Sequence, residues 1–166
     1  MAASSEGSGF DRDVVLIGGC GHVGLPLAVA FADRGASVCI YDISEPAVAA
    51  ANDARLPFDE PSAAPLLERV VAAGRLRAST DPAVVGTAEN VVVVIGTPVD
   101  DHLDPNRTAI TQALGECAPY LRDGQLLVLR STVFPASRHW WRRRSPASAC
   151  RSTWPSAPSG SPRARR

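Results

Sequence analysis

The sequence contains no lysine, so all 17 of its basic residues are arginines, a bias typical of a GC-rich gene. No apolar run reaches the length of about 18 residues that a transmembrane helix needs, which excludes a membrane-spanning protein. The first residues, MAASSEGSGFDRD, contain neither a basic nor an apolar region, which excludes a secretory signal peptide. We therefore expect a cytoplasmic protein that has no membrane partner.

Cysteine is scarce, and its spacing argues against a metal site or a disulfide. None of the four cysteines forms a CxxC pair, and none lies at metal-ligand spacing from a histidine. Cys39 falls inside a predicted strand and Cys117 inside a predicted helix. We expect the cysteines to be small buried hydrophobic residues in a reducing compartment, and we predict no metal ligands.

The formal net charge of zero conceals an abrupt change along the chain. Residues 1–136 hold nine arginines and all 17 acids, a charge of −8, whereas residues 137–166 hold eight arginines and no acid, a charge of +8. The tail also combines Trp-Trp, an arginine triplet and many Ser and Pro residues without any helix or strand period. We predict a disordered lead-in over 1–12, a folded domain over 13–135 and a disordered tail over 136–166.

Within the predicted domain, buried apolar runs alternate with amphipathic stretches. The runs predict strands, and the amphipathic stretches predict helices. This alternation is typical of an α/β fold, here a Rossmann-type doubly wound parallel sheet. The strands are expected at 14–18, 37–41, 75–80, 90–96 and 125–130, and the helices at 22–34, 45–53, 66–74, 108–121 and, briefly, 81–88.

A glycine-rich stretch, Gly19-Cys20-Gly21-His22-Val23-Gly24, joins the first predicted strand to the first predicted helix. In the dinucleotide-binding fingerprint the first glycine permits the tight turn, the second lets a pyrophosphate approach the backbone, and the third lets the helix pack closely. The helix N-terminus then faces the phosphates, where its free N–H groups and its dipole favour negative charge.

Asp42 ends the second predicted strand, 23 positions after Gly19. A carboxylate there accepts hydrogen bonds from the ribose hydroxyls and repels a 2′-phosphate, so the sequence favours NAD over NADP. The alternatives are a glycine turn with an unrelated surface acid, or an FAD site. The correct order of strand, glycines, helix and acid favours NAD.

Several stretches resemble, in order, the UDP-glucose/GDP-mannose dehydrogenases, which are nucleotide-sugar 6-dehydrogenases. These stretches are VGLPLAVAFADRG, IYD, AAANDARLPFDEP, LLERVVAAGRLRASTD, VVVVIGTPVD and LRDGQLLVLRSTVFP, and together they cover about residues 13–135. The details lean toward the branch that oxidises UDP-N-acetyl sugars of the ManNAc or GlcNAc type. The resemblance implies NAD as cofactor and a UDP-sugar as partner of the full-length enzyme, whose C6 hydroxymethyl group is oxidised to a carboxylate.

The resemblance also implies roles for single residues. His22 and Val23 match a pair that contacts the cofactor, although tyrosine is common where His22 stands. Thr97 in GTP matches a cofactor-contacting threonine, and Thr132 in STV matches a threonine near the nicotinamide, which makes it the candidate catalytic residue. Both threonines follow predicted strand ends, where ligands bind in open α/β sheets. The alternative is that each hydroxyl bonds to its own loop backbone.

The family also uses a cysteine nucleophile and a lysine that stabilises an oxyanion, both from later segments. This sequence has no lysine, and Cys150 lies in an unrelated context. The dimerisation helix and the sugar-nucleotide domain are also missing. We therefore expect this chain to bind NAD without completing the oxidation. The alternatives are a non-catalytic NAD-binding module, or a dehydrogenase of the hydroxyacyl-CoA or phosphogluconate type, against which GTPVD and LRSTV argue.

The basic tail has a separate explanation. With GC-rich codons chosen for residues 135–142 and 148–164, a reading frame shifted by two nucleotides yields GVTALVE and GLPVDVAFCPERIAEG, which resemble the next segments of the family. We infer a frameshift near Pro135. The rival hypothesis is that RHWWRRR binds nucleic acid, because it combines basic and aromatic residues. We expect no nucleic-acid partner.

Overall fold

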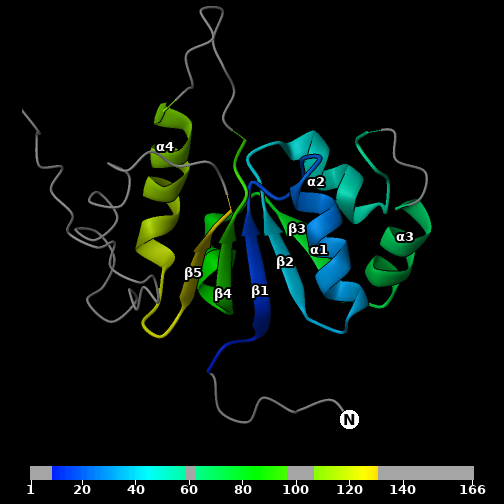
Figure 1. Cartoon of the computed structure of the whole chain (residues 1–166), viewed down its shortest axis with the longest axis horizontal. Coiled ribbons are helices and arrows are strands. Elements are labelled where there is room, and N and C mark those ends of the chain that lie inside the picture. Colours follow the sequence, from blue (N-terminus) through cyan, green and yellow to red (C-terminus); the bar gives the residue numbers. More distant parts are fainter. Residues whose placement is uncertain (1–8, 59–62, 97–106, 131–166) are drawn as a thin grey trace, which may run out of the picture.

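The computed structural model describes residues 9–58, 63–96 and 107–130. Five parallel strands form one sheet in the order β3-β2-β1-β4-β5 (Figure 1). This order confirms the predicted Rossmann-type α/β fold. Most of the lead-in and the whole tail lie outside the described residues, so their disorder stays a prediction. The strands are β1 (Arg12–Ile17), β2 (Val38–Tyr41), β3 (Leu76–Ser79), β4 (Ala88–Val93) and β5 (Leu126–Leu129).

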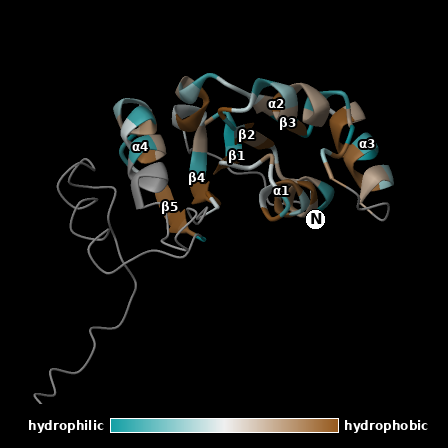
Figure 2. Cartoon of the chain, turned by 90° about the horizontal axis from the view of Figure 1, so that it is seen from above, coloured by the Kyte–Doolittle hydropathy of each residue, from teal (hydrophilic) through white to brown (hydrophobic). Residues whose placement is uncertain are grey.

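The helices cover both faces of the sheet, and Figure 2 shows α1 and α4 on opposite sides of it. Each lies where the hydrophobic period predicts a helix. The last predicted helix ends early, because a short 3₁₀ turn that contains Pro119 replaces its final residues. The helices are α1 (Gly24–Asp33), α2 (Glu45–Asn52), α3 (Ala64–Ala72) and α4 (Arg107–Cys117), with 3₁₀ turns η1 (Pro82–Thr87) and η2 (Ala118–Tyr120).

Local signals in the sequence set several helix ends. The Ser44 hydroxyl accepts a hydrogen bond from the Ala47 N–H at 3.4 Å and caps α2, with a proline in the first turn. Gly35 and Gly74 follow α1 and α3 with φ of +100° and +67°. Glycine adopts this left-handed conformation without steric cost, so these residues turn the chain back toward the sheet.

Alternate residues of the strands enter two cores, one on each face of the sheet. The first core joins Leu16 and Ile40 to Leu25 of α1 and to apolar residues of α2 and α3. The second joins Ile17 and Tyr41 to residues of β4, η1 and α4. Because both faces are covered, the carboxyl-terminal parts of the central strands are continuous apolar runs: Val14–Ile17, Val38–Tyr41 and Val91–Val93. The two cores hold the carboxyl ends of β1, β2 and β4 side by side.

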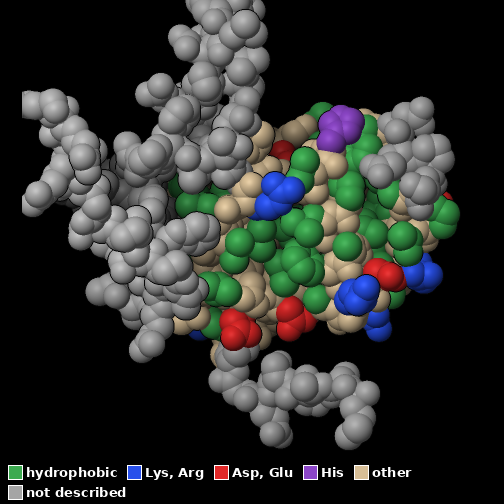
Figure 3. Space-filling model, in the orientation of Figure 1, with side chains coloured by type: hydrophobic (Ala, Val, Ile, Leu, Met, Phe, Trp, Pro, Cys, Tyr) green, Lys and Arg blue, Asp and Glu red, His purple; other side chains and the backbone are tan. Residues whose placement is uncertain are grey.

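Among the described residues, β5 is covered on one face only. Leu127 and Leu129 pack into the second core, but Leu126 and Val128 remain 52% and 40% exposed on the face that carries α1. They pair in register with Asn90 and Val92 of β4. Figure 3 shows hydrophobic side chains gathered in the middle of this face. Leu126 and Val128 therefore make the β5 edge of this face apolar.

The described helices are short, and the described cysteines lie inside the fold. No helix there combines the length and the apolar character that crossing a membrane requires. Cys20, Cys39 and Cys117 are buried, as predicted, and are free thiols, while Cys150 lies outside the described residues.

Candidate functional site

The turn that leaves β1 depends on two glycines with different roles. Gly18 has a φ of +74°, so it makes the left-handed turn. The sequence analysis expected Gly19 to permit the tight turn and assigned no backbone conformation to Gly18. A side chain at Gly19 would lie 2.9 Å from both Leu16 Cβ and Ile40 Cγ2, so this glycine is needed for space. Gly18 therefore supplies the left-handed conformation of the turn, and Gly19 supplies the space that the turn needs.

The two later glycines of the fingerprint face opposite surroundings. A Cβ atom at Gly24 would lie 2.5 Å from the Gly19 Cα, so α1 can approach the turn only because Gly24 has no side chain. Apart from its chain neighbours, a Cβ atom at Gly21 would meet no atom of the described residues within 4 Å. Gly24 thus closes the helix onto the sheet, as predicted, and Gly21 borders open space at the N-terminus of α1.

The N-terminus of α1 has no side-chain cap. Val23 precedes the helix, makes no capping hydrogen bond and is 52% exposed. The first N–H groups of a helix find no partner within it. In α1, Leu25 donates its N–H to the Gly21 carbonyl at 3.0 Å, and Pro26 has no N–H to donate. This helix end also carries the positive end of the helix dipole, which suits an anion. The His22 ring stacks on the Phe58 ring with centroids 4.3 Å apart, so the turn is braced from the α2–α3 connection.

Asp42 connects the end of β2 to the glycine turn. One carboxylate oxygen accepts the Cys20 backbone N–H at 3.0 Å, and the other accepts the Ser44 backbone N–H at 3.1 Å. Each oxygen retains a further lone pair, because an ionised carboxylate has about four acceptor sites. The carboxylate is therefore held in place before any ligand arrives.

The Cys20 thiol lies in the same turn and is unreactive. Burial, and secondarily the charge of Asp42, raise the pKa of this thiol to about 12. A thiol with such a pKa remains protonated at neutral pH and is a poor nucleophile. Cys20 therefore belongs to the structure of the turn.

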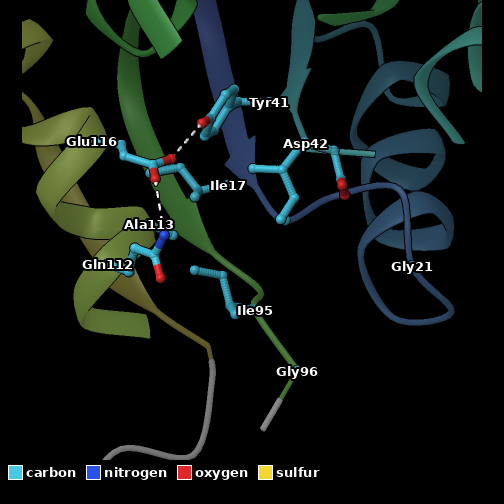
Figure 4. Close-up of a pocket in the computed structure, with 11 residues that line it drawn as sticks. Ile17, Gly21, Tyr41, Asp42, Ile95, Gly96, Gln112, Ala113 and Glu116 are labelled. Carbon is cyan, nitrogen blue, oxygen red and sulfur yellow. Dashed lines mark hydrogen bonds between the residues drawn. The ribbon is translucent and has the colours of Figure 1, made fainter. Parts of the chain in front are cut away.

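A cavity of about 340 Å³ opens beside Gly21 and Asp42 at the carboxyl ends of β1, β2 and β4 (Figure 4). Its walls are mostly apolar and include Ile17, Ile43 and Ile95. Ligands of open α/β sheets bind at this edge, where the strand order reverses. The uncapped helix, the open space at Gly21 and the fixed carboxylate fit the phosphates and ribose of a dinucleotide.

One side of the cavity is polar, and the sequence analysis did not predict its residues as part of the site. The Tyr41 hydroxyl donates to Glu116 Oε2 at 3.2 Å, and Gln112 Nε2 donates to Glu116 Oε1 at 3.4 Å (Figure 4). Gln112 and Glu116 lie one turn apart on α4, and in the sequence polar residues at this spacing are typical of a solvent-exposed helix face. The pairing with Tyr41 depends on the sheet, because the two residues are 75 positions apart.

The remaining predicted site residues are Thr97 and Thr132, and both lie outside the described residues. Gly96, immediately before Thr97, lines the cavity. Arg130, two positions before Thr132, follows β5 and donates its backbone N–H to the Val93 carbonyl at 2.9 Å. The two threonine roles remain predictions.

The sequence profile of the UDP-glucose/GDP-mannose dehydrogenase family, NAD binding domain, matches residues 13–148. The UDP-N-acetyl-D-mannosamine dehydrogenase of Escherichia coli K12 is 36% identical over 114 residues, which are 69% of this chain and 26% of that protein. The UDP-glucose 6-dehydrogenase of Haloferax volcanii is 39% identical over 121 residues, 70% of this chain and 28% of that protein. The chain thus spans little more than a quarter of the length of these curated relatives.

Solved structures give the same result. The GDP-mannose dehydrogenase ternary complex from Pseudomonas aeruginosa matches with a TM-score of 0.70 and 27% identity, over 76% of this chain and 30% of that one. An NDP-N-acetyl-D-galactosaminuronic acid dehydrogenase from Methanosarcina mazei matches with a TM-score of 0.71 and 26% identity, over 81% and 31%. The profile confirms NAD as the predicted cofactor and argues against the hydroxyacyl-CoA and phosphogluconate alternatives. The chain therefore belongs to the UDP-glucose/GDP-mannose dehydrogenase family, whose NAD-binding domain it carries.

Proposed function

We propose that this chain is the NAD-binding part of a nucleotide-sugar 6-dehydrogenase that acts on a UDP-sugar in the cytoplasm. The relatives that support the substrate class are dehydrogenases of UDP-N-acetyl-D-mannosamine and UDP-glucose. When bound, NAD would accept a hydride from the C6 carbon of the sugar. In this proposal the folded domain extends over residues 13–135, and the chain's own residues bind and orient the cofactor.

The observation that carries the proposal is the arrangement of Asp42 beside the glycine turn. Its carboxylate is fixed by the Cys20 and Ser44 N–H groups and lines the cavity that Gly21 also borders. The pyrophosphate would lie over Gly21 at the N-terminus of α1, while the adenosine ribose hydroxyls would donate to Asp42. His22, Val23 and Gly24 would shape the phosphate site, with Gly19 behind it.

The two threonines complete the proposal at the other end of the cofactor. Thr97 would contact the dinucleotide just beyond Gly96, which lines the cavity. Thr132 would lie near the nicotinamide, where it would help to hold a water or the reacting hydroxyl of the sugar. The carboxyl ends of β4 and β5, which precede these residues, lie side by side in the sheet, and this neighbourhood supports the assignment.

Calorimetric titration of the 166-residue chain with NAD and NADP tests the cofactor site. We expect NAD to bind about tenfold or more tightly than NADP, because Asp42 repels the 2′-phosphate. Asp42→Asn keeps the size of the side chain but removes the charge, so it should weaken NAD binding and bring the two affinities together.

Asp123→Asn is the matched control, because Asp123 is exposed in the turn before β5 and does not line the cavity. This variant should retain the preference for NAD. If the wild-type chain is folded by circular dichroism yet binds no NAD, or if Asp42→Asn leaves both affinities unchanged, the proposal is wrong.

A further inference from the structure

The polar side of the cavity is formed by Gln112 and Glu116, which we call the α4 polar pair, together with Tyr41 of β2. Glu116 receives hydrogen bonds from both neighbours, one on each carboxylate oxygen. All three residues line the same cavity as Asp42 (Figure 4). A few polar groups facing a mostly apolar cavity form the usual pattern of a site that fixes a ligand's orientation.

The position of Asp42 determines which part of NAD would reach this pair. Tyr41 and Asp42 are consecutive residues, and Ile43 follows them as a cavity wall. A ribose held by Asp42 therefore carries its base into the cavity between β2 and α4. The walls formed by Ile43, Ile95 and Ala113 suit a flat heteroaromatic ring, and the polar pair would meet its hydrogen-bonding edge.

We propose that the α4 polar pair recognises the amino edge of adenine, with Glu116 accepting from the 6-amino group and Gln112 donating to the ring nitrogen N1. This inference rests on the proposed function, since the base is placed by NAD binding at Asp42. An ionised carboxylate is an acceptor only, and the adenine 6-amino group is a donor. A 6-oxo purine presents an acceptor to the same carboxylate and a donor at N1, so the pair selects against it.

Tyr41 is a positioning residue in this arrangement. Its ring is buried in the second core, and its hydroxyl donates to one oxygen of Glu116. Burial, followed by the nearby Cys117 thiol and Glu116, raises the pKa of the Tyr41 hydroxyl to about 12. The hydroxyl therefore stays a donor at neutral pH and directs the remaining lone pairs of Glu116 toward the cavity.

The test compares NAD with nicotinamide hypoxanthine dinucleotide, in which an oxygen replaces the 6-amino group and nothing else of the scaffold changes. Calorimetry on the full 166-residue chain should show NAD binding about tenfold more tightly, since a hydrogen bond to a charged group contributes roughly that factor. Glu116→Gln should reduce this ratio to about one, because an amide can donate to the 6-oxo group as well as accept from an amine.

Glu68→Gln is the matched control, because Glu68 is exposed on α3 and does not line the cavity. It should leave the ratio unchanged. Tyr41→Phe should lower the ratio in the wild-type background but not in the Glu116→Gln background. A purely structural role of Tyr41 would weaken both dinucleotides equally and leave the ratio as it was.

The outcomes separate this inference from the proposed function. If both dinucleotides bind equally to the wild-type chain, or if Glu116→Gln retains the preference for NAD, adenine recognition by the α4 polar pair is wrong and the NAD site at Asp42 stands. If neither dinucleotide binds to folded protein, both proposals are overturned together.

Discussion

At the scale of single residues, Gly21 and Gly24 offer a pair of identical substitutions with opposite expected effects. Gly24→Ala places a Cβ atom 2.5 Å from the Gly19 Cα and 2.7 Å from the Gly19 carbonyl oxygen. Backbone atoms cannot move aside cheaply, so this variant should lose roughly 1–3 kcal/mol or more of unfolding free energy in urea titrations.

Gly21→Ala should behave differently, because within the described part of the chain the added methyl group meets no atom beyond its chain neighbours within 4 Å. Its unfolding free energy should remain within about 0.5–1 kcal/mol of the wild type. NAD affinity should nevertheless fall about tenfold or more, since the methyl group occupies the space needed by the pyrophosphate. A Gly21→Ala chain that binds NAD normally would contradict the phosphate position, and a stable Gly24→Ala chain would contradict the packing argument.

Sequence reasoning succeeded for residues whose roles depend on near neighbours in the chain. The fingerprint glycines, the Ser44 cap and the acid at the end of β2 follow local rules, and the structure places each at its expected location. It failed to separate Gly18 from Gly19, because which one takes positive φ depends on how Leu16 and Ile40 pack around the turn. It missed Glu116 because its partner, Tyr41, meets it only across the folded sheet.

At the scale of elements, a buried glutamine fixes β5 to its neighbours. Gln125 is 4% exposed, and its Nε2 donates to the carbonyls of Val85 and Ala88 at 2.8 and 2.5 Å. Its Oε1 accepts from the Arg122 N–H at 2.7 Å. One side chain thus joins η1, β4 and the turn before β5, all through hydrogen bonds to backbone groups.

Gln125→Glu should destabilise the chain in a pH-dependent way. A carboxylate facing two carbonyl oxygens cannot donate to them, so the folded state should raise the pKa of the new acid. The loss of unfolding free energy should be small near pH 4 and grow as pH rises above the ordinary Glu pKa, reaching roughly 3 kcal/mol at neutral pH.

Gln125→Met is the matched control for this effect. It has similar volume, leaves the same carbonyls unpaired and carries no titratable group. Its loss of about 1–3 kcal/mol should therefore be independent of pH. Urea denaturation of both variants at several pH values provides the measurement, and equal pH profiles would show that Gln125 does not face the carbonyls as described.

The order of helices and strands could be predicted from the sequence. Their exact ends, and which strand faces are covered by helices, could be predicted only in part. Period and composition located all five strands, since each is a short apolar run bounded by turn residues. An apolar run does not show on which face of the strand a helix will pack. β5 is as apolar as the central strands, yet Leu126 and Val128 remain exposed because no described helix packs over them. Coverage is a property of the assembled layers.

At the scale of the whole molecule, the absence of lysine makes the alkaline range unusually informative. Thiols and tyrosines are the groups that titrate there, since arginine stays protonated. Burial raises the pKa of the Cys39 thiol and raises those of Cys20 and Cys117 to about 12, from an ordinary value of 9.0. These thiols lie in the cores on both sides of the sheet, so they report on global unfolding.

The folded chain should therefore lose stability as pH rises above 9, because the unfolded state releases these thiol protons while the folded state retains them. Each thiol contributes a slope of up to about 1.4 kcal/mol per pH unit, which ends when pH passes the raised folded value. Urea denaturation at several pH values between 7 and 11 measures the unfolding free energy, and its slope against pH is the sum of the contributions of the thiols.

Cys117→Ala removes one titrating core thiol. It should reduce the slope of unfolding free energy against pH by about one thiol's contribution, and it should also lower stability at neutral pH through lost packing. A stability that is flat above pH 9, or a slope unchanged in Cys117→Ala, would mean that this thiol is not held in a closed core.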